Sequence, residues 1–109
     1  MNPWTGLERR AVRRFPIALP VHYRVIRPAH MDRLRKGHTV NMSSQGILIT
    51  GDGQLVPKML LEVVINWPAK LERKVSLKLV MRGRVVRVQE GSMPLVALRI
   101  AQHWFRTSK

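Results

Sequence analysis

The sequence contains no cysteine, no long hydrophobic run and few acidic residues. The absence of cysteine excludes disulfides, thiolate metal sites and a cysteine nucleophile. No segment approaches the roughly 20 consecutive apolar residues of a membrane-spanning helix. Residues 1–14 also lack the apolar core of a secretory signal. We therefore expect a soluble protein that resides in the cytoplasm.

Residue types that commonly carry catalysis are sparse and scattered. The acidic side chains form no motif of a paired acid and base, and the histidines have neither the spacing nor the cysteine partners of a zinc site. These residues are Glu8, Asp32, Asp52, Glu62, Glu72, Glu90, His22, His30, His38 and His103. The sequence therefore predicts a protein that is not an enzyme and holds no metal.

Positive charge, in contrast, is abundant. Lys and Arg number 20 against 6 Asp and Glu, which gives a formal net charge of +14. This imbalance favours phosphate-bearing partners or anionic membrane surfaces, without choosing between nucleic acid, nucleotide and lipid. A chain of 109 residues is long enough for one domain with a modest core.

Apolar and polar residues alternate in several short segments, which is the pattern of strands that bury one face. The expected strands are residues 17–25, 39–42, 46–50, 61–67, 75–88 and 96–100. Residues 27–37, which contain a proline and four Lys or Arg, are expected to form an exposed loop. Short strands without alternating helices predict an all-β protein, a closed or nearly closed six-stranded antiparallel barrel.

Two local irregularities are expected in this barrel. The apolar parity of 75–88 slips after Gly83, from Met81 to Val86 and Val88, which predicts a bulge or bend at the glycine. Pro68 is expected to end the strand before it. The tail 101–109 is expected to form a short helix or an ordered extension that packs Trp104 and Phe105 on the barrel.

A cluster of arginines precedes the first strand. Arg9, Arg10, Arg13 and Arg14 occur together, and Arg10 and Arg14 form an Arg-x-x-x-Arg motif. A guanidinium can donate two hydrogen bonds at once to phosphate oxygens or to the O6 and N7 atoms of guanine, and it can stack on a purine. Residues 1–14 are therefore read as a flexible basic arm, and 15–109 as a single domain. Taken alone, the cluster also fits a basic tail that aids solubility.

A second motif lies between the second and third expected strands. Asn41, Ser43 and Gly46 form the pattern Asn-x-Ser-x-x-Gly. The amide and hydroxyl can bind a polar ligand, and glycine adopts backbone conformations that other residues resist. The same residue types are common in ordinary turns, so this motif alone does not distinguish a site from a turn.

Together and in this order, the two motifs resemble those of the PilZ domain family, in which Arg-x-x-x-Arg is followed by Asp or Asn and then x-Ser-x-x-Gly. The similarity extends to the residues after Gly46 and to the segment 83–88, and it covers roughly residues 8–101. The resemblance implies a PilZ-type barrel that binds the bacterial second messenger cyclic di-GMP as a receptor or adaptor. It implies neither catalysis nor a further cofactor.

The resemblance also implies roles for individual residues. Arg10 and Arg14 would bind phosphates and guanine edges, whereas Asn41, Ser43 and Gly46 would hold a guanine on the barrel surface. Arg9 resembles the preceding arginine of members that bind the messenger as an intercalated dimer. The family more often has Asp where this chain has Asn41, and an amide offers fewer acceptors to guanine N1 and N2, which predicts weaker binding.

The mechanism implied is that the N-terminal arm closes over cyclic di-GMP and presents a new surface to a downstream protein, which the sequence does not identify. Two alternatives remain open at this point. A small basic barrel can bind RNA or single-stranded DNA, although the few aromatic residues count against it. The domain can also act as a protein-interaction adaptor that needs no ligand.

Overall fold

The computed structural model describes residues 18–27, 31–51, 54–71 and 75–108, and these residues form strands and turns without a helix. The strands are β1 (Pro20–Arg27), β2 (Met31–Met42), β3 (Gly46–Thr50), β4 (Leu60–Leu71), β5 (Val75–Gln89) and β6 (Leu95–Ser108). The expectations for the arm 1–14 therefore lie outside the described residues. Within the described part, no helix is long and apolar enough to cross a membrane.

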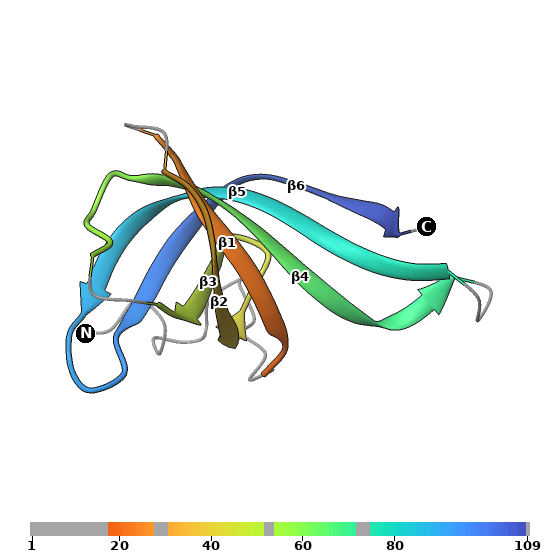
Figure 1. The fold of residues 1–109 in the computed structure, drawn as a ribbon, viewed down its shortest axis with the longest axis horizontal. Helices are drawn as coiled ribbons and strands as arrows, with labels where there is room; N and C mark the ends of the chain where they lie inside the picture. The colour runs from red at the N-terminus through yellow and green to blue at the C-terminus, as the bar shows by residue number, and fades with distance from the viewer. Residues whose placement is uncertain (1–17, 28–30, 52–53, 72–74, 109) are drawn as a thin grey trace.

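The six strands form a closed barrel in the order β1-β2-β3-β6-β5-β4 (Figure 1). Every neighbouring pair is antiparallel, and β1 closes the barrel by pairing with β4 from Val21↔Ile65 to Arg27↔Leu60. Closure leaves no unpaired edge around the barrel itself, which protects it from edge-to-edge association. The predicted six-stranded antiparallel barrel is confirmed.

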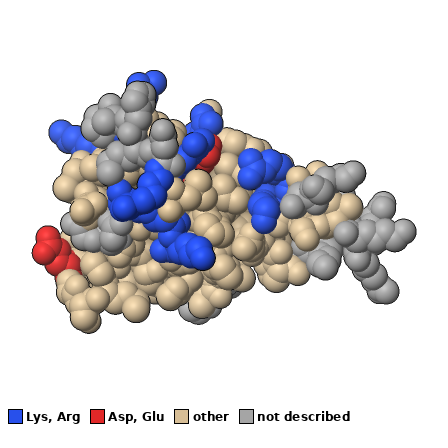
Figure 2. Space-filling view, in the orientation of Figure 1, with Lys and Arg blue, Asp and Glu red and all other residues tan. Residues whose placement is uncertain are grey.

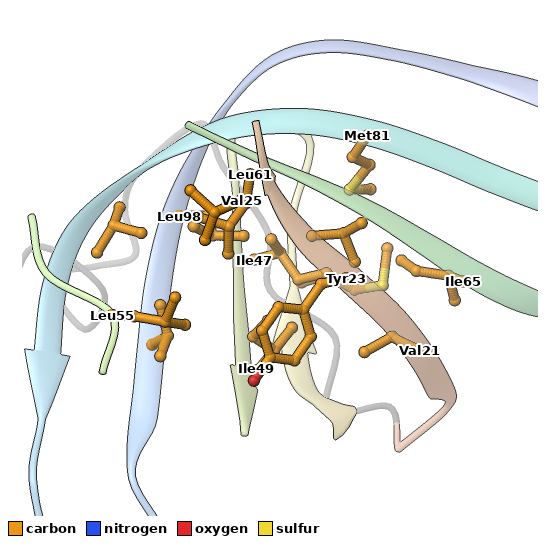
Figure 3. Packing of buried hydrophobic residues seen from close by; sticks show 14 of the residues in the cluster. Val21, Tyr23, Val25, Ile47, Ile49, Leu55, Leu61, Ile65, Met81 and Leu98 are labelled. Atoms are coloured by element: carbon orange, nitrogen blue, oxygen red, sulfur yellow. The ribbon is translucent and has the colours of Figure 1, made fainter. Parts of the chain in front are cut away.

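The interior of the barrel is filled by the alternate apolar side chains of all six strands (Figure 3). Tyr23, Ile49 and Leu61 are among the largest side chains that lie fully buried. Leu55, from the connection between β3 and β4, joins the same cluster. Because successive side chains of a strand point to opposite faces, this core directs the intervening residues to the outer surface of the barrel.

The expected exposed loop at 27–37 is wrong over most of its length. β2 begins at Met31 and pairs with β1, so that Arg35 lies opposite Tyr23. Arg35 is only 7% exposed, although its charge and its basic neighbours had predicted an exposed position. Backbone pairing with β1 decides the structure here, because each strand residue gains ladder hydrogen bonds whatever its side chain.

β5 has an irregular register near Gly83, as predicted, but the pairing with β6 places the extra residues elsewhere. Arg82 pairs with Gln102 and Gly83 with Ile100, so the unpaired residue at this shift is on β6. A second shift between Val85 and Arg87 leaves Val86 as the extra residue of β5. Val85 is buried and Val86 is 52% exposed. The prediction that Val86 faces inward is therefore wrong, because the parity changes at Val86.

Three strands extend beyond the closed barrel as a twisted wing (Figure 1). The wing consists of residues 66–71 of β4, 75–78 of β5 and 100–108 of β6. Pro68 does not end β4, because the register shift between Trp67 and Lys70 accommodates it. The C-terminal tail is thus an extension of β6 and not a helix. In the wing the rings of Trp67 and Phe105 meet edge to face at 5.6 Å.

Candidate functional site

The residues of the Asn-x-Ser-x-x-Gly motif surround the tight turn between β2 and β3. The Ser43 amide donates a hydrogen bond of 2.9 Å to the Gly46 carbonyl oxygen, which closes the turn. The carbonyl oxygen of the preceding residue, Gln45, accepts a 2.9 Å hydrogen bond from the amide of Ile100 on β6. Backbone hydrogen bonds therefore fix the turn both internally and against β6.

The Ser43 side chain also holds this turn. Its Oγ accepts hydrogen bonds from the amides of Gln45 at 3.2 Å and Gly46 at 3.1 Å, and it donates to the Gly46 carbonyl oxygen at 3.4 Å. A hydroxyl has one donor and two acceptor positions, so these three contacts occupy its full capacity. Ser43 is buried, and in this geometry its hydroxyl stabilises the turn.

Asn41 lies on the outer surface next to the turn. It pairs with Leu48 of β3, while the adjacent pair of Met42 and Ile47 contributes side chains to the core. The Asn41 side chain is half-buried, and its amide forms no hydrogen bond with another described residue. Asn41 therefore presents both a donor and an acceptor beside the turn.

Gly46 is the first residue of β3 and is buried. Positive φ angles among the described residues occur at Lys58 and Gly91, so Gly46 does not use the left-handed conformation that glycine permits. It pairs instead with Arg99 of β6. Glycine therefore leaves this position on the outer face of β3 without a side chain, next to Arg99.

The arginines of the arm lie outside the described residues. Arg9, Arg10 and Arg14 all fall within residues 1–17, and β1 begins at Pro20. Of the sequence-predicted site, the structure thus brings together Asn41, Ser43 and Gly46. The proposed contribution of the arm stays a prediction.

The described surface is strongly basic, and Figure 2 shows Lys and Arg side chains gathered on one face with few acidic side chains between them. Glu62 and Glu90 are the acidic residues whose side chains the structure describes. Glu62 lies between two arginines, with 3.2 Å from its Oε1 to Arg24 Nη2 and 3.1 Å from its Oε2 to Arg82 Nη2. Little negative charge therefore remains to neutralise the other basic side chains.

Two arginines near the turn were not singled out by the sequence. Arg99 lies opposite Gly46 on one side and opposite Arg84 of β5 on the other. Arg84 is fixed by a 2.9 Å hydrogen bond from its Nη1 to the carbonyl oxygen of Lys58. These residues are far apart in the sequence, and only the strand register brings them to the turn.

The described residues contain no group of three or more His, Cys, Asp or Glu side chains that could hold a metal ion. The arrangement around the turn instead offers the side-chain amide of Asn41 and the guanidinium groups of Arg84 and Arg99 on the neighbouring strands. Such a site can bind a ligand that carries both hydrogen-bonding groups and negative charge.

Comparisons with known proteins agree with this geometry. The family model for the PilZ domain matches residues 8–103. The solved structure of the Bacillus subtilis inhibitor of motility (MotI/DgrA) is similar in fold, with a TM-score of 0.68 and 16% sequence identity. The match covers 88% of this chain but 44% of that one, so this chain spans less than half of that neighbour. The search of curated proteins finds no match. The extent of the family match shows that this chain belongs to the PilZ family of cyclic di-GMP-binding regulatory domains.

Proposed function

We propose that this protein is a receptor for cyclic di-GMP that passes the signal to another protein. The ligand lies between the basic arm and the turn of the barrel, and the arm closes over it. We place this activity in the cytoplasm, because a second messenger acts inside the cell. The proposed ligand-binding residues are Arg9, Arg10, Arg14, Asn41, Ser43 and Gly46.

The observation that carries the proposal is the position of the family motif on the barrel. Asn41, Ser43 and Gly46 come together at one hydrogen-bonded turn, on the outer surface of a basic barrel. The Asn41 side chain lies half-buried on this outer surface, where a ligand of the size of a dinucleotide can reach it. Its positive surroundings attract the two phosphates of cyclic di-GMP.

The geometry supports a division of roles within the motif. The Asn41 amide is available to a ligand, and its oxygen and NH₂ group match the donors and O6 acceptor of a guanine edge. Ser43 uses its hydroxyl to hold the amides of Gln45 and Gly46. In this proposal Ser43 contributes by keeping the turn in the shape against which the guanine lies.

Calorimetric titration of the purified protein with cyclic di-GMP tests the proposal, with GTP and cyclic GMP as controls. We expect saturable binding of cyclic di-GMP and little heat from either control. A ratio of two ligands per protein supports a role for Arg9 in binding an intercalated dimer. Absence of heat and of competition at high ligand concentration would reject the receptor function.

The arm is tested by substitution of its arginines. Arg10→Ala or Arg14→Ala should weaken binding by about 1–3 kcal/mol, which is the scale of a lost bidentate guanine contact. Arg106→Ala, an exposed arginine on the wing, is the matched control and should bind as the unmodified protein does. Unchanged affinity in both arm variants would contradict the proposed roles.

Closure of the arm predicts a change in amide hydrogen exchange. Residues 1–14 should exchange more slowly when the protein is saturated with cyclic di-GMP, because ordering the arm protects its amides. The barrel strands serve as an internal reference. Equal exchange of the arm with and without ligand would exclude closure as the means of signalling.

A second candidate function is binding of RNA or single-stranded DNA. It is favoured by the net charge of +14 and by the exposed aromatic side chains Trp104 and Phe105, on which bases can stack. The affinity for a single-stranded oligonucleotide would then fall steeply with salt, because many counterions are released. If neither ligand binds, a ligand-independent adaptor is the remaining reading.

A further inference from the structure

Arg99 occupies a distinctive place on the outer face of the barrel. Arg99 lies on β6, between two neighbouring strands. It pairs with Gly46 of β3 on one side and with Arg84 of β5 on the other. Its neighbour Leu98 belongs to the core, so the side chain of Arg99 points outward, where it is exposed. Because Gly46 has no side chain, nothing from β3 at this position competes with the Arg99 guanidinium for the space beside the turn.

The backbone around Arg99 is joined to the turn and is tightly held. The amide of Ile100 donates to the carbonyl oxygen of Gln45 at 2.9 Å. On the other side, a Cβ added to Gly83 would lie 2.5 Å from the Arg99 carbonyl oxygen, which shows how closely β5 approaches. The position of Arg99 relative to the turn is therefore set by the barrel and does not depend on a flexible loop.

Arg84 and Arg99 form a like-charged pair across β5 and β6. Directly opposed like charges in a sheet are destabilising, so this pair carries a cost that the fold alone does not explain. Arg84 is directed toward the β4 side by its hydrogen bond to the Lys58 carbonyl oxygen. Arg99 forms no ion pair with a side chain in the described part of the chain, which leaves its guanidinium available.

The nearby carboxylates do not neutralise this pair. Glu62 is engaged by Arg24 and Arg82, and Glu90 follows the end of β5 at the far end of its hairpin with β6. A third arginine, Arg87 of β5, pairs with Ala97, which lies two residues before Arg99 on β6. The positive potential beside the turn is thus uncompensated by the described acidic side chains, which is the condition for attracting an anion.

We propose that Arg99 is a further ligand-binding residue, which donates its guanidinium to a phosphate of the cyclic dinucleotide held at the turn. The inference rests on the proposed function. A planar guanidinium donates two parallel hydrogen bonds to phosphate oxygens. Arg84 adds positive charge to the subsite. Its hydrogen bond to the Lys58 carbonyl oxygen holds its guanidinium away from the phosphate position that Arg99 contacts. The phosphate is thereby held from the barrel side.

The test is calorimetric titration of the full chain with cyclic di-GMP, comparing Arg99→Ala, Arg99→Lys and the control Arg106→Ala on the same strand. Arg99→Ala should lose at least about fivefold in affinity, the lower end of the range for a bidentate contact. Arg99→Lys should recover part of this loss, because charge remains without the planar fork. The affinity of Arg99→Ala should also depend less on salt, because one charged contact is removed.

Thermal unfolding without ligand separates binding from folding. Arg99→Ala should be as stable as the unmodified protein or more so, because the opposition with Arg84 is relieved. One outcome is that Arg99→Ala binds the ligand as tightly as the unmodified protein while Arg14→Ala binds it more weakly. That result would overturn the Arg99 subsite and leave the receptor function standing. No binding by the unmodified protein would overturn both.

Discussion

Gly83 lies so close to Arg99 that a Cβ on Gly83 would be 2.5 Å from the Arg99 carbonyl oxygen. Both residues lie on the same side of the shift in register between β5 and β6, where β6 carries one extra residue. Glycine at this position therefore permits a close approach of two backbones. Arg99 in turn pairs with Gly46, which ends the turn between β2 and β3.

Gly83→Ala should destabilise the barrel, because the added methyl group meets backbone atoms that cannot rotate away. We expect the free energy of unfolding to fall by about 1–3 kcal/mol, the usual cost of overpacking. Chemical denaturation measures this change. Val86→Ala, at the exposed bulge of β5, is the control and should remain within about 0.5 kcal/mol. Equal effects of the two substitutions would show that β5 and β6 can separate at little cost.

Ser43→Ala removes the acceptor of the Gln45 and Gly46 amides. Leaving such donors unsatisfied costs about 1–3 kcal/mol, so the free energy of unfolding should decrease by this amount. The adjacent Ser44→Ala is a matched control, since Ser44 is exposed. If Ser43→Ala weakens ligand binding without any loss of stability, Ser43 contacts the ligand directly and the turn-holding role is wrong.

Glu62→Gln tests the bridge between β1, β4 and β5. Glu62 is mostly buried, whereas the side chains of Arg24 and Arg82 are 44% and 42% exposed, so solvent screens part of the attraction. We expect a loss of about 1 kcal/mol at low salt that becomes smaller as salt is added. Denaturation at several salt concentrations checks both. A loss that does not vary with salt would point to packing and not to charge.

The edge-to-face contact of Trp67 with Phe105 should help to hold the wing together. A double-mutant cycle with Trp67→Ala and Phe105→Ala should give an interaction of about 0.5–1.5 kcal/mol. The control cycle pairs Trp67 with Trp104, which neighbours Phe105 on β6 and therefore faces the opposite side of the sheet. Two cycles of equal size would mean that the rings act only through general stability of the wing.

Much of the barrel could be predicted from local pattern. The alternation of Val21, Tyr23 and Val25 and of Leu61, Val63 and Ile65 predicted strands with one buried face, and these side chains do form the core. Pattern was informative there because a strand that buries one face must alternate with a period of two. The motif turn between β2 and β3 was also predicted, since Ser and Gly favour tight turns.

Other features depended on pairing between distant segments. Arg35 lies in the barrel wall because β2 pairs with β1, and Val86 faces outward because β6 sets the register of β5. Pro68 remains within β4 because the register shift removes the need for its missing amide proton. A single sequence does not display register, so residue type alone misled the interpretation at each of these positions.

The sequence by itself determined the fold class and the presence of the motif, because hydrophobic alternation and turn residues act over a few neighbours. Only the tertiary structure decided what surrounds that motif. Arg99 meets Gly46 and Arg84 because three strands from distant parts of the chain share one hydrogen-bonded row. The physical reason is that strand register is set by closure of the whole barrel, and closure depends on all six strands together.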